Sequence, residues 1–382
     1  MIYLDHNATT PPAPAVIAAM LPVLTSLWAN ASSQHGAGQD AKRVLGMARK
    51  DVARALGCKP AEVIFTSGAT EANHLAVRGL LAGATPERRR VLFSRVEHPG
   101  HLRLAQSLVT QGYQVDLIPV LDDGRLDLRA AAALIGPDVA LVSLMAANNE
   151  TGVLMPVAEV AHLTQQAGAR LHVDATQFIG KQPFDFLTCG ADAVSLSAHK
   201  LQGPKGVGAL LLRHGVALSP QTSGSQERGR RGGTENLAGI VGLAAALALL
   251  DDVAMEAVRV ATLRDALEEG LIRALPETHI WSRQVPRLPG TSFLRFGQIS
   301  ADVVLQRLDR LGVAASSGAA CSSGGTEPSH VLTAMGVPTD EALAAVRLSL
   351  GRTTTLDDVT YLLKALPPLL APLLLEDLLT AP

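Results

Sequence analysis

Cysteine is scarce in this chain, and its scarcity excludes two kinds of protein. The 382 residues include three cysteines, Cys58, Cys189 and Cys321, which lie far apart and form no CxxC pair. A secreted disulfide scaffold needs an even, closely spaced set, and a structural zinc site needs paired ligands. The eleven histidines also lack an HExxH motif. We therefore expect neither a disulfide framework nor a metal site.

An excess of one charge and very long apolar runs are missing as well. Lys and Arg number 33 against 35 Asp and Glu, so the net charge of −2 gives no basic field to attract nucleic acid. The longest apolar stretch, 237–250, is shorter than the roughly 20 residues that span a membrane and predicts a buried helix. The first residues lack the basic start and apolar run of a secretory signal. We predict a cytoplasmic protein with no membrane or nucleic-acid partner.

The apolar runs that are present indicate an α/β fold. Hydrophobic residues make up 47% of the chain, enough for one large core and a second lobe. Their alternation is typical of a mainly parallel sheet, in which ligands bind at the carboxyl ends of the strands. The strands are predicted at 62–66, 91–94, 115–119, 139–144, 170–174 and 193–196, with helices such as 71–81, 101–111 and 157–167 between them.

After residue 232 the pattern changes to that of a smaller α+β lobe. We expect long helices at about 236–250 and 253–274, strands at 291–296 and 345–350, a helix at 301–311 and a last helix. Pro367-Pro368 and Pro372 are expected to break a helix in the Leu- and Pro-rich end. We predict a large domain over 15–255 and a small domain made of 1–14 and 256–382, with a Gly- and Ser-rich loop at 316–325.

Three polar segments follow predicted strands and are candidates for chemistry. The turn 66–71 opens a helix whose N–H groups and dipole suit a phosphate, although an ordinary N-cap at Ser67 or Thr70 is the alternative. Asp174 ends a strand, where it needs a cationic partner unless it is only a helix cap. Lys200 follows the next strand and is able to form a Schiff base, whereas Lys205 is explained equally well as surface charge.

Pyridoxal phosphate needs the three parts that these segments supply at one end of a parallel sheet. An amine holds its aldehyde, N–H and hydroxyl donors hold its phosphate, and a carboxylate keeps its ring nitrogen protonated so that the ring acts as an electron sink. The combination predicts a pyridoxal-phosphate enzyme.

At these motifs the chain resembles the cysteine desulfurases of the NifS and IscS type, in the class V aminotransferase group. The resemblance runs from YLDHNATT at 3–10 to RLSLGR at 347–352. It implies a fold-type I pyridoxal-phosphate transferase, with a mainly parallel sheet in the large domain, that forms an obligate homodimer. The chain departs from the common pattern at Pro99-Gly100 and at Ala31, which are not catalytic groups of the family.

The resemblance also implies roles for single residues. Lys200 is the Schiff-base lysine, and Asp174 pairs with the pyridinium nitrogen. Gln177 bonds the ring hydroxyl oxygen, and His98 stacks on the ring and moves protons. Asn149 lies near the cofactor and substrate. Arg347 binds the substrate carboxylate. The phosphate is contacted by Ala69, Thr70, Ser197, His199 and the other subunit's Thr234.

Cys321 lies in the segment SSGAACSSGG, which matches the loop that bears the family's sulfur-accepting cysteine. A loop of Gly, Ala and Ser has little apolar surface to hold it, so it is able to swing from cofactor to acceptor. The implied reaction removes sulfur from L-cysteine and leaves L-alanine and a persulfide on Cys321. A sulfur-acceptor protein of iron–sulfur cluster assembly or tRNA thiolation then takes the sulfur. Cys58 and Cys189 have no expected role.

Other functions remain open at this point. A selenocysteine lyase or a small-amino-acid aminotransferase on the same scaffold would use the same cofactor residues, although an aminotransferase has no use for the Cys321 loop. A catalytically silent scaffold is a further alternative, and a colourless protein that takes up no cofactor would indicate it.

Overall fold

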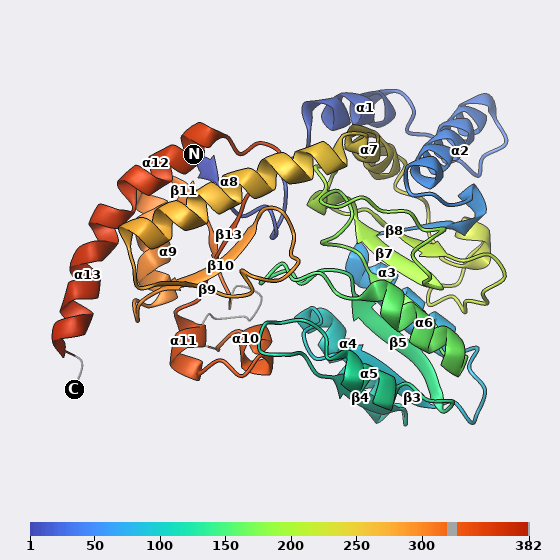
Figure 1. Cartoon of the computed structure of the whole chain (residues 1–382). Coiled ribbons are helices and arrows are strands. Elements are labelled where there is room, and N and C mark those ends of the chain that lie inside the picture. The colour runs from blue at the N-terminus through green and yellow to red at the C-terminus, as the bar shows by residue number, and fades with distance from the viewer. Residues whose placement is uncertain (319–326, 381–382) are drawn as a thin grey trace.

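A seven-stranded sheet with helices on both faces forms the larger part of the molecule (Figure 1). The computed structural model describes residues 1–318 and 327–380, the last five of these by backbone alone, so Cys321 lies outside the described residues. The sheet runs in the order β2 (Val63–Thr66), β8 (Gly208–Leu212), β7 (Ala193–Ser197), β6 (Arg170–Asp174), β5 (Val139–Met145), β3 (Arg90–Ser94) and β4 (Gln114–Ile118). Its strands are parallel except β8, which is antiparallel to both neighbours.

Alternating side chains of these strands fill two cores on opposite faces of the sheet. In β3, Val91 and Phe93 face one core and Leu92 faces the other, as the two-residue period of a strand requires. Helices α3 (Ala69–Leu81) and α4 (Pro99–Thr110) cover the first face. The second face is covered by α1 (Pro14–Thr25), α2 (Gly36–Ala55), α5 (Leu128–Leu134), α6 (Val157–Ala167) and α7 (Leu237–Leu247).

The second lobe has its own antiparallel sheet and its own core. The sheet order is β12 (Ser316–Ser317), β13 (Val346–Ser349), β10 (Thr291–Phe296) and β9 (Thr278–Ile280). Its core takes side chains from α8 (Val253–Ala274), α9 (Ala301–Arg310) and α12 (Leu356–Ala365), and also Leu4 from the N-terminus. β1 (Ile2–Tyr3) pairs with β11 (Val313–Ala314), so the first residues lie in this lobe.

The mainly parallel α/β architecture that the sequence predicts is confirmed, and so are the six predicted strands and the helices between them. The predicted domain limits place the boundary near the start of α8, the long helix that runs from one lobe to the other in Figure 1. The short helices α10 (His330–Ala334) and α11 (Thr339–Leu343) belong to the predicted small domain, yet Val331, Leu332 and Ala342 pack into the core of the large sheet.

The prediction for the C-terminal segment was wrong in part. The helix does break after α12, but α13 (Pro367–Thr380) continues through Pro372. Pro367 and Pro368 stand in the first turn, where the backbone N–H groups need no helical partner. Leu366, Leu370 and Leu374 are buried in the second core and outweigh the one hydrogen bond that Pro372 removes. By length and composition, Leu356–Leu375 is long and apolar enough to cross a membrane, and 28% of this stretch is buried inside the structure.

Candidate active site

The carboxyl ends of the parallel strands open into a cavity of about 700 Å³. Ten of the residues predicted to form the site line it, although they come from positions 69 to 347 of the chain. They are Ala69, Thr70, His98, Asn149, Asp174, Gln177, Ser197, His199, Lys200 and Arg347. The N-terminal segment also lines the cavity, through Asn7, Ala8 and Thr9, which the sequence did not mark as site residues.

Asp174 is the buried acid of the cavity, at the end of β6. Its Oδ2 accepts a hydrogen bond from Asn73 Nδ2 at 2.7 Å, and its Oδ1 accepts one from the Thr176 N–H at 3.0 Å. Burial raises the pKa of Asp174, but the nearby His101 and these hydrogen bonds outweigh it and hold the pKa below its usual value. The carboxylate is therefore kept ionised and oriented, as a partner for a protonated ring nitrogen has to be.

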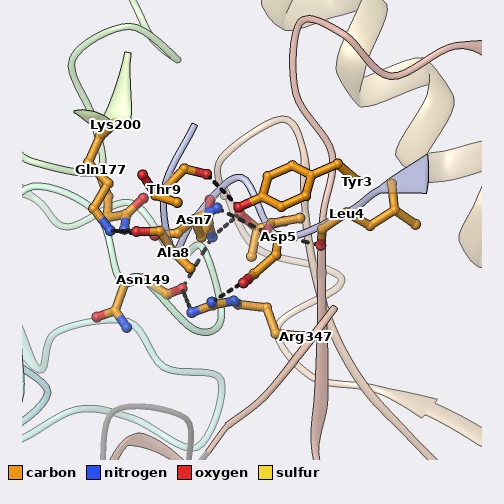
Figure 2. A network of polar contacts seen from close by, with 12 residues as sticks. Tyr3, Leu4, Asp5, Asn7, Ala8, Thr9, Asn149, Gln177, Lys200 and Arg347 are labelled. Carbon is orange, nitrogen blue, oxygen red and sulfur yellow. Dashed lines mark hydrogen bonds and ion pairs between the residues drawn. The ribbon is translucent and has the colours of Figure 1, made fainter. Parts of the chain in front are cut away.

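Lys200 stands at the end of the neighbouring strand, in the short 3-10 helix Ala198–Lys200. Its Nζ donates to the backbone carbonyls of Asn7 at 2.5 Å and Ala8 at 2.9 Å, as Figure 2 shows. Gln177 Nε2 donates to the same Asn7 carbonyl at 2.8 Å. The N-terminal segment thus holds in place both the lysine and the amide that the resemblance assigns to the cofactor.

The turn between β2 and α3 forms the phosphate-binding candidate. Gly68 is the N-cap of α3, and no side chain caps the first turn, so Ser67 and Thr70 are not the N-cap that the alternative interpretation requires. The turn lies close to β8, because a Cβ atom on Gly208 would come within 2.5 Å of the Leu196 carbonyl oxygen and 2.8 Å of Gly68 Cα. Glycine at position 208 therefore allows β8 to pass in close contact with the turn between β2 and α3.

Two histidines face the cavity in the neutral form. His98 is the N-cap of α4, and its Nδ1 accepts from the Gly100 N–H at 3.1 Å, so the ring proton is assigned to Nε2. Desolvation is the main cause that lowers the pKa of His98, even though its ring is open to the cavity. Burial, with the charges of Lys200 and Lys205, lowers the pKa of His199 to about 4. Pro99 and Gly100, where the sequence departs from the common family pattern, complete this cap. Pro99 stands in the first turn, and Gly100 supplies the N–H group.

Arg347 brings a positive charge to the opposite wall from β13. It is only 3% exposed. Its Nη2 pairs with Asp5 Oδ1 at 2.9 Å and its Nη1 donates to the Asn149 carbonyl at 3.0 Å (Figure 2). Its Nε is buried without a hydrogen-bond partner. The guanidinium is thus oriented and still has a donor to offer.

Three residues that line the cavity each carry a buried polar atom without a hydrogen-bond partner among the described residues. These atoms are Arg347 Nε, Asn149 Oδ1 and Asn73 Oδ1. Such atoms are rare in folded proteins because each one costs free energy to desolvate. A polar ligand that carries both donors and acceptors would satisfy them, and a phosphorylated pyridine with an amino acid is such a ligand.

The remaining predicted residues lie elsewhere. Thr234 is exposed and lines a neighbouring pocket of about 240 Å³ that shares Ser67 and Gly206 with the main cavity. Cys321 lies outside the described residues, but Ser316, five positions before it, lines the main cavity. Burial raises the pKa of Cys58 to about 12 and also raises that of Cys189, which makes both thiols poor nucleophiles. Within the described ranges, no group of three His, Cys, Asp or Glu is placed to hold a metal ion.

A lysine and an ionised aspartate at adjacent strand ends, above an uncapped helix start, define a fold-type I enzyme of the aminotransferase class. The comparisons agree with this class. The family model for class-V aminotransferases matches residues 2–362. A cysteine desulfurase of Cereibacter sphaeroides is 48% identical over 96% of this chain and 95% of its own length. The cysteine desulfurase NifS of Azotobacter vinelandii is 43% identical over 97% of this chain and 93% of its own.

Comparison with solved structures supports the same class of enzyme. A NifS-like protein superposes with a TM-score of 0.90 and 34% identity over 97% of this chain and 99% of its own. The chain belongs to the class-V aminotransferase family. Within that family it is a cysteine desulfurase of the NifS type.

Proposed function

We propose that this cysteine desulfurase holds pyridoxal phosphate in the 700 Å³ cavity, takes L-cysteine there as substrate and passes its sulfur to Cys321. The observation that carries the proposal is the composition of one cavity wall. Lys200, Asp174 and the start of α3 suit the cofactor, Arg347 suits a substrate carboxylate, and Ser316 leads to the cysteine.

The residues present fit the cofactor. Lys200 would hold its aldehyde, Asp174 its ring nitrogen and Gln177 its ring hydroxyl, while the phosphate would lie against the first turn of α3. Ala69, Thr70, Ser197 and His199 surround that position. When bound, pyridoxal phosphate supplies an electron sink for the bonds at the substrate's Cα.

The chain's own groups orient the substrate and move its protons. Arg347, whose guanidinium is oriented by Asp5 and by the Asn149 carbonyl, is the residue that we expect to receive the substrate carboxylate. Lys200 Nζ, at the end of β7, is the group that we expect to take the Cα proton. His98, neutral and protonated on Nε2, is able to pass a proton on within the same cavity.

Sulfur transfer needs a thiolate that reaches the substrate. Cys321 stands five positions after Ser316, which lines the cavity, and five residues span at most roughly 17 Å when extended. We propose that this short tether brings the thiol to the cavity. We expect the Cys321 thiolate to attack the substrate sulfur, so that an S–S bond forms and the C–S bond breaks. The carbon keeps the electron pair, takes a proton and becomes L-alanine, and Cys321 is left as a persulfide.

The homodimer belongs to this proposal. Ile17, Leu21 and Leu24 on one face of α1 are more than half exposed, as is Trp28, and an apolar patch of this kind is typical of a protein interface. Thr234 is exposed and lines the neighbouring pocket instead of the main cavity, which supports the role of a residue that reaches the partner's phosphate. We propose a cytoplasmic sulfur-acceptor protein of iron–sulfur assembly or tRNA thiolation as the partner that receives the persulfide sulfur.

The experiment compares sulfide and alanine release from L-cysteine, in the presence of reductant and pyridoxal phosphate, for wild type and Cys321→Ala. Wild type is expected to release both products in equal amounts. Cys321→Ala should keep the yellow absorbance of the bound cofactor and release no sulfide. The matched controls Cys58→Ala and Cys189→Ala should behave as wild type, because both thiols have raised pKa values.

Two results would contradict the proposal. Undiminished sulfide release by Cys321→Ala would remove the assigned role of that cysteine. Turnover that depends on an added 2-oxo acid would point to an aminotransferase instead.

A further inference from the structure

A second lysine lies next to Lys200 but outside the cofactor cavity. Lys181 comes four residues after Gln177 and is partly buried. It lines a separate, small cavity of about 50 Å³, of which Asn7 and Lys200 also form part of the wall. Asn7 and Lys200 line the large cavity too, so Lys181 lies behind the cofactor site and does not belong to its surface. The mechanism proposed above gives this lysine no role.

The contacts of Lys181 determine how two amide groups are turned. Its Nζ donates to Gln177 Oε1 at 2.5 Å and to Asn7 Oδ1 at 2.6 Å. Lys181 Nζ is the donor in both contacts, so both amides present their oxygen ends to Lys181. Their nitrogen ends then point the other way. Gln177 Nε2 donates to the Asn7 carbonyl at 2.8 Å, and Asn7 Nδ2 donates to the Asn149 carbonyl at 3.1 Å.

We propose that Lys181 is a positioning residue that fixes the Gln177 amide with its nitrogen toward the cavity, so that Gln177 donates a hydrogen bond to the cofactor's ring hydroxyl oxygen. The inference rests on the proposed function, which places that oxygen beside Gln177. Nε2 carries two hydrogens, of which one goes to the Asn7 carbonyl, and the other is left for the cofactor. With the amide reversed, Gln177 would offer only an acceptor there.

The surroundings of Lys181 are positively charged. Burial, followed by the charges of Lys200 and Arg347, lowers the pKa of Lys181 well below its usual value. Burial also lowers the pKa of His6, and the charge of Lys181 in turn lowers it further. A neutral amine still has two hydrogens to donate, which matches its two contacts with the amide oxygens, so the arrangement does not require the charge.

A donor at the ring oxygen has a consequence that spectroscopy can measure. It withdraws electron density from the ring oxygen and makes the neighbouring nitrogen, which links Lys200 to the cofactor, less basic. Losing one hydrogen bond to a charged group changes such an equilibrium by about one pH unit. Without Lys181, the pH at which the visible absorbance of the bound cofactor titrates should rise by about that amount.

The test uses holoenzyme without substrate and follows the cofactor absorbance as a function of pH. Lys181→Met keeps an unbranched apolar stem and removes the donor, and Gln177→Met removes the amide. Each variant should raise the titration midpoint by about one unit. The double variant should show no further rise, because both substitutions then remove the same hydrogen bond. Lys50→Met, at an exposed lysine of α2, is the control and should leave the midpoint unchanged.

Several results would overturn the inference. An unchanged midpoint in Lys181→Met would show that the amide does not depend on this lysine. A shift that persists in the Gln177→Met background would mean that Lys181 acts on Lys200 through its own charge. Should Lys181→Met fail to fold, Gln177→Glu replaces the donor by a near-isosteric acceptor and must raise the midpoint in the same way, or the inference fails. Wild type that stays colourless with added cofactor would instead defeat the proposed function itself.

Discussion

Asp174 keeps its charge in a buried position because two neighbouring donors and His101 act on it. One of these donors, Asn73, was not among the residues predicted from the sequence. It lies one turn after Thr70 on α3, so the helix whose start would hold the phosphate also fixes the carboxylate that would pair with the ring nitrogen. The i, i+3 spacing from Thr70 was the available signal, because residues three apart share one helix face.

Replacing Asn73 tests this arrangement at the level of a single residue. In Asn73→Ala, the Oδ2 atom of Asp174 loses its donor, and the pKa of Asp174 should rise. A lost hydrogen bond to a charged group predicts a weakening of pyridoxal-phosphate binding by roughly 10- to 100-fold. Absorbance titration of the apoprotein with the cofactor measures this constant. His74→Ala, at the next position of α3, is the control, and equal dissociation constants for the two variants would contradict the role of Asn73.

The predicted site residues share a property that the missed ones lack. Lys200, Asp174 and Gln177 stand in motifs that follow strands, so their position in the sequence already places them at one sheet edge. Lys181 and Asn7 act through side-chain contacts whose direction no spacing reveals. Asp5 pairs with Arg347 across 342 residues of chain.

Among the secondary-structure elements, every strand of the large sheet was predicted from the sequence except the antiparallel strand β8. The segment GALLL of β8 has no β-branched residue and begins with glycine, so it lacks the usual strand signal. The helices α1 and α2 were also missed. Prolines stand before and inside α1, which packs against α7. α2 does carry a helical pattern, with Ala41, Leu45, Ala48 and Val52 on its buried face, so its signal was present in the sequence.

Substitution of Gly208 tests how β8 supports the turn between β2 and α3. In Gly208→Ala, the added Cβ would meet the backbone of Leu196 and Gly68, and neither is free to move without disturbing the phosphate turn. We expect a loss of stability of about 1–3 kcal/mol together with weaker cofactor binding. Urea unfolding of the apoprotein and cofactor titration measure the two effects. Gly46→Ala in α2 has open space around the new Cβ and should be neutral or stabilising, so equal behaviour of both variants would refute the close approach.

At the scale of the whole molecule, two histidines at the junction of the lobes make stability depend on pH. Burial is the main cause that lowers the pKa of His6 and of His199, each to about 4. In the unfolded chain a histidine takes up its proton near pH 6.5. Between these values the unfolded state binds more protons than the folded state, so the free energy of unfolding should fall as the pH drops from about 6.5 to about 4.

Urea unfolding of the apoprotein at pH 7.5, 6 and 4.5 is the measurement. His6→Gln, which cannot titrate, should lose less stability than wild type over the same interval, because one of the histidines that take up a proton on unfolding is gone. An identical pH dependence in wild type and His6→Gln would show that His6 is not protonated on unfolding in this range.

The segment from Tyr3 to Thr9 also sets an order of events for the newly made chain. These residues leave the ribosome long before their partners, because the Asn7 N–H donates to Ser349 Oγ and Asp5 pairs with Arg347, each 342 positions later. The carbonyls that hold Lys200 therefore lack their final support until synthesis has passed Ser349. A nascent or C-terminally truncated chain should have an incomplete lysine site, which would keep unfinished protein from capturing a reactive aldehyde.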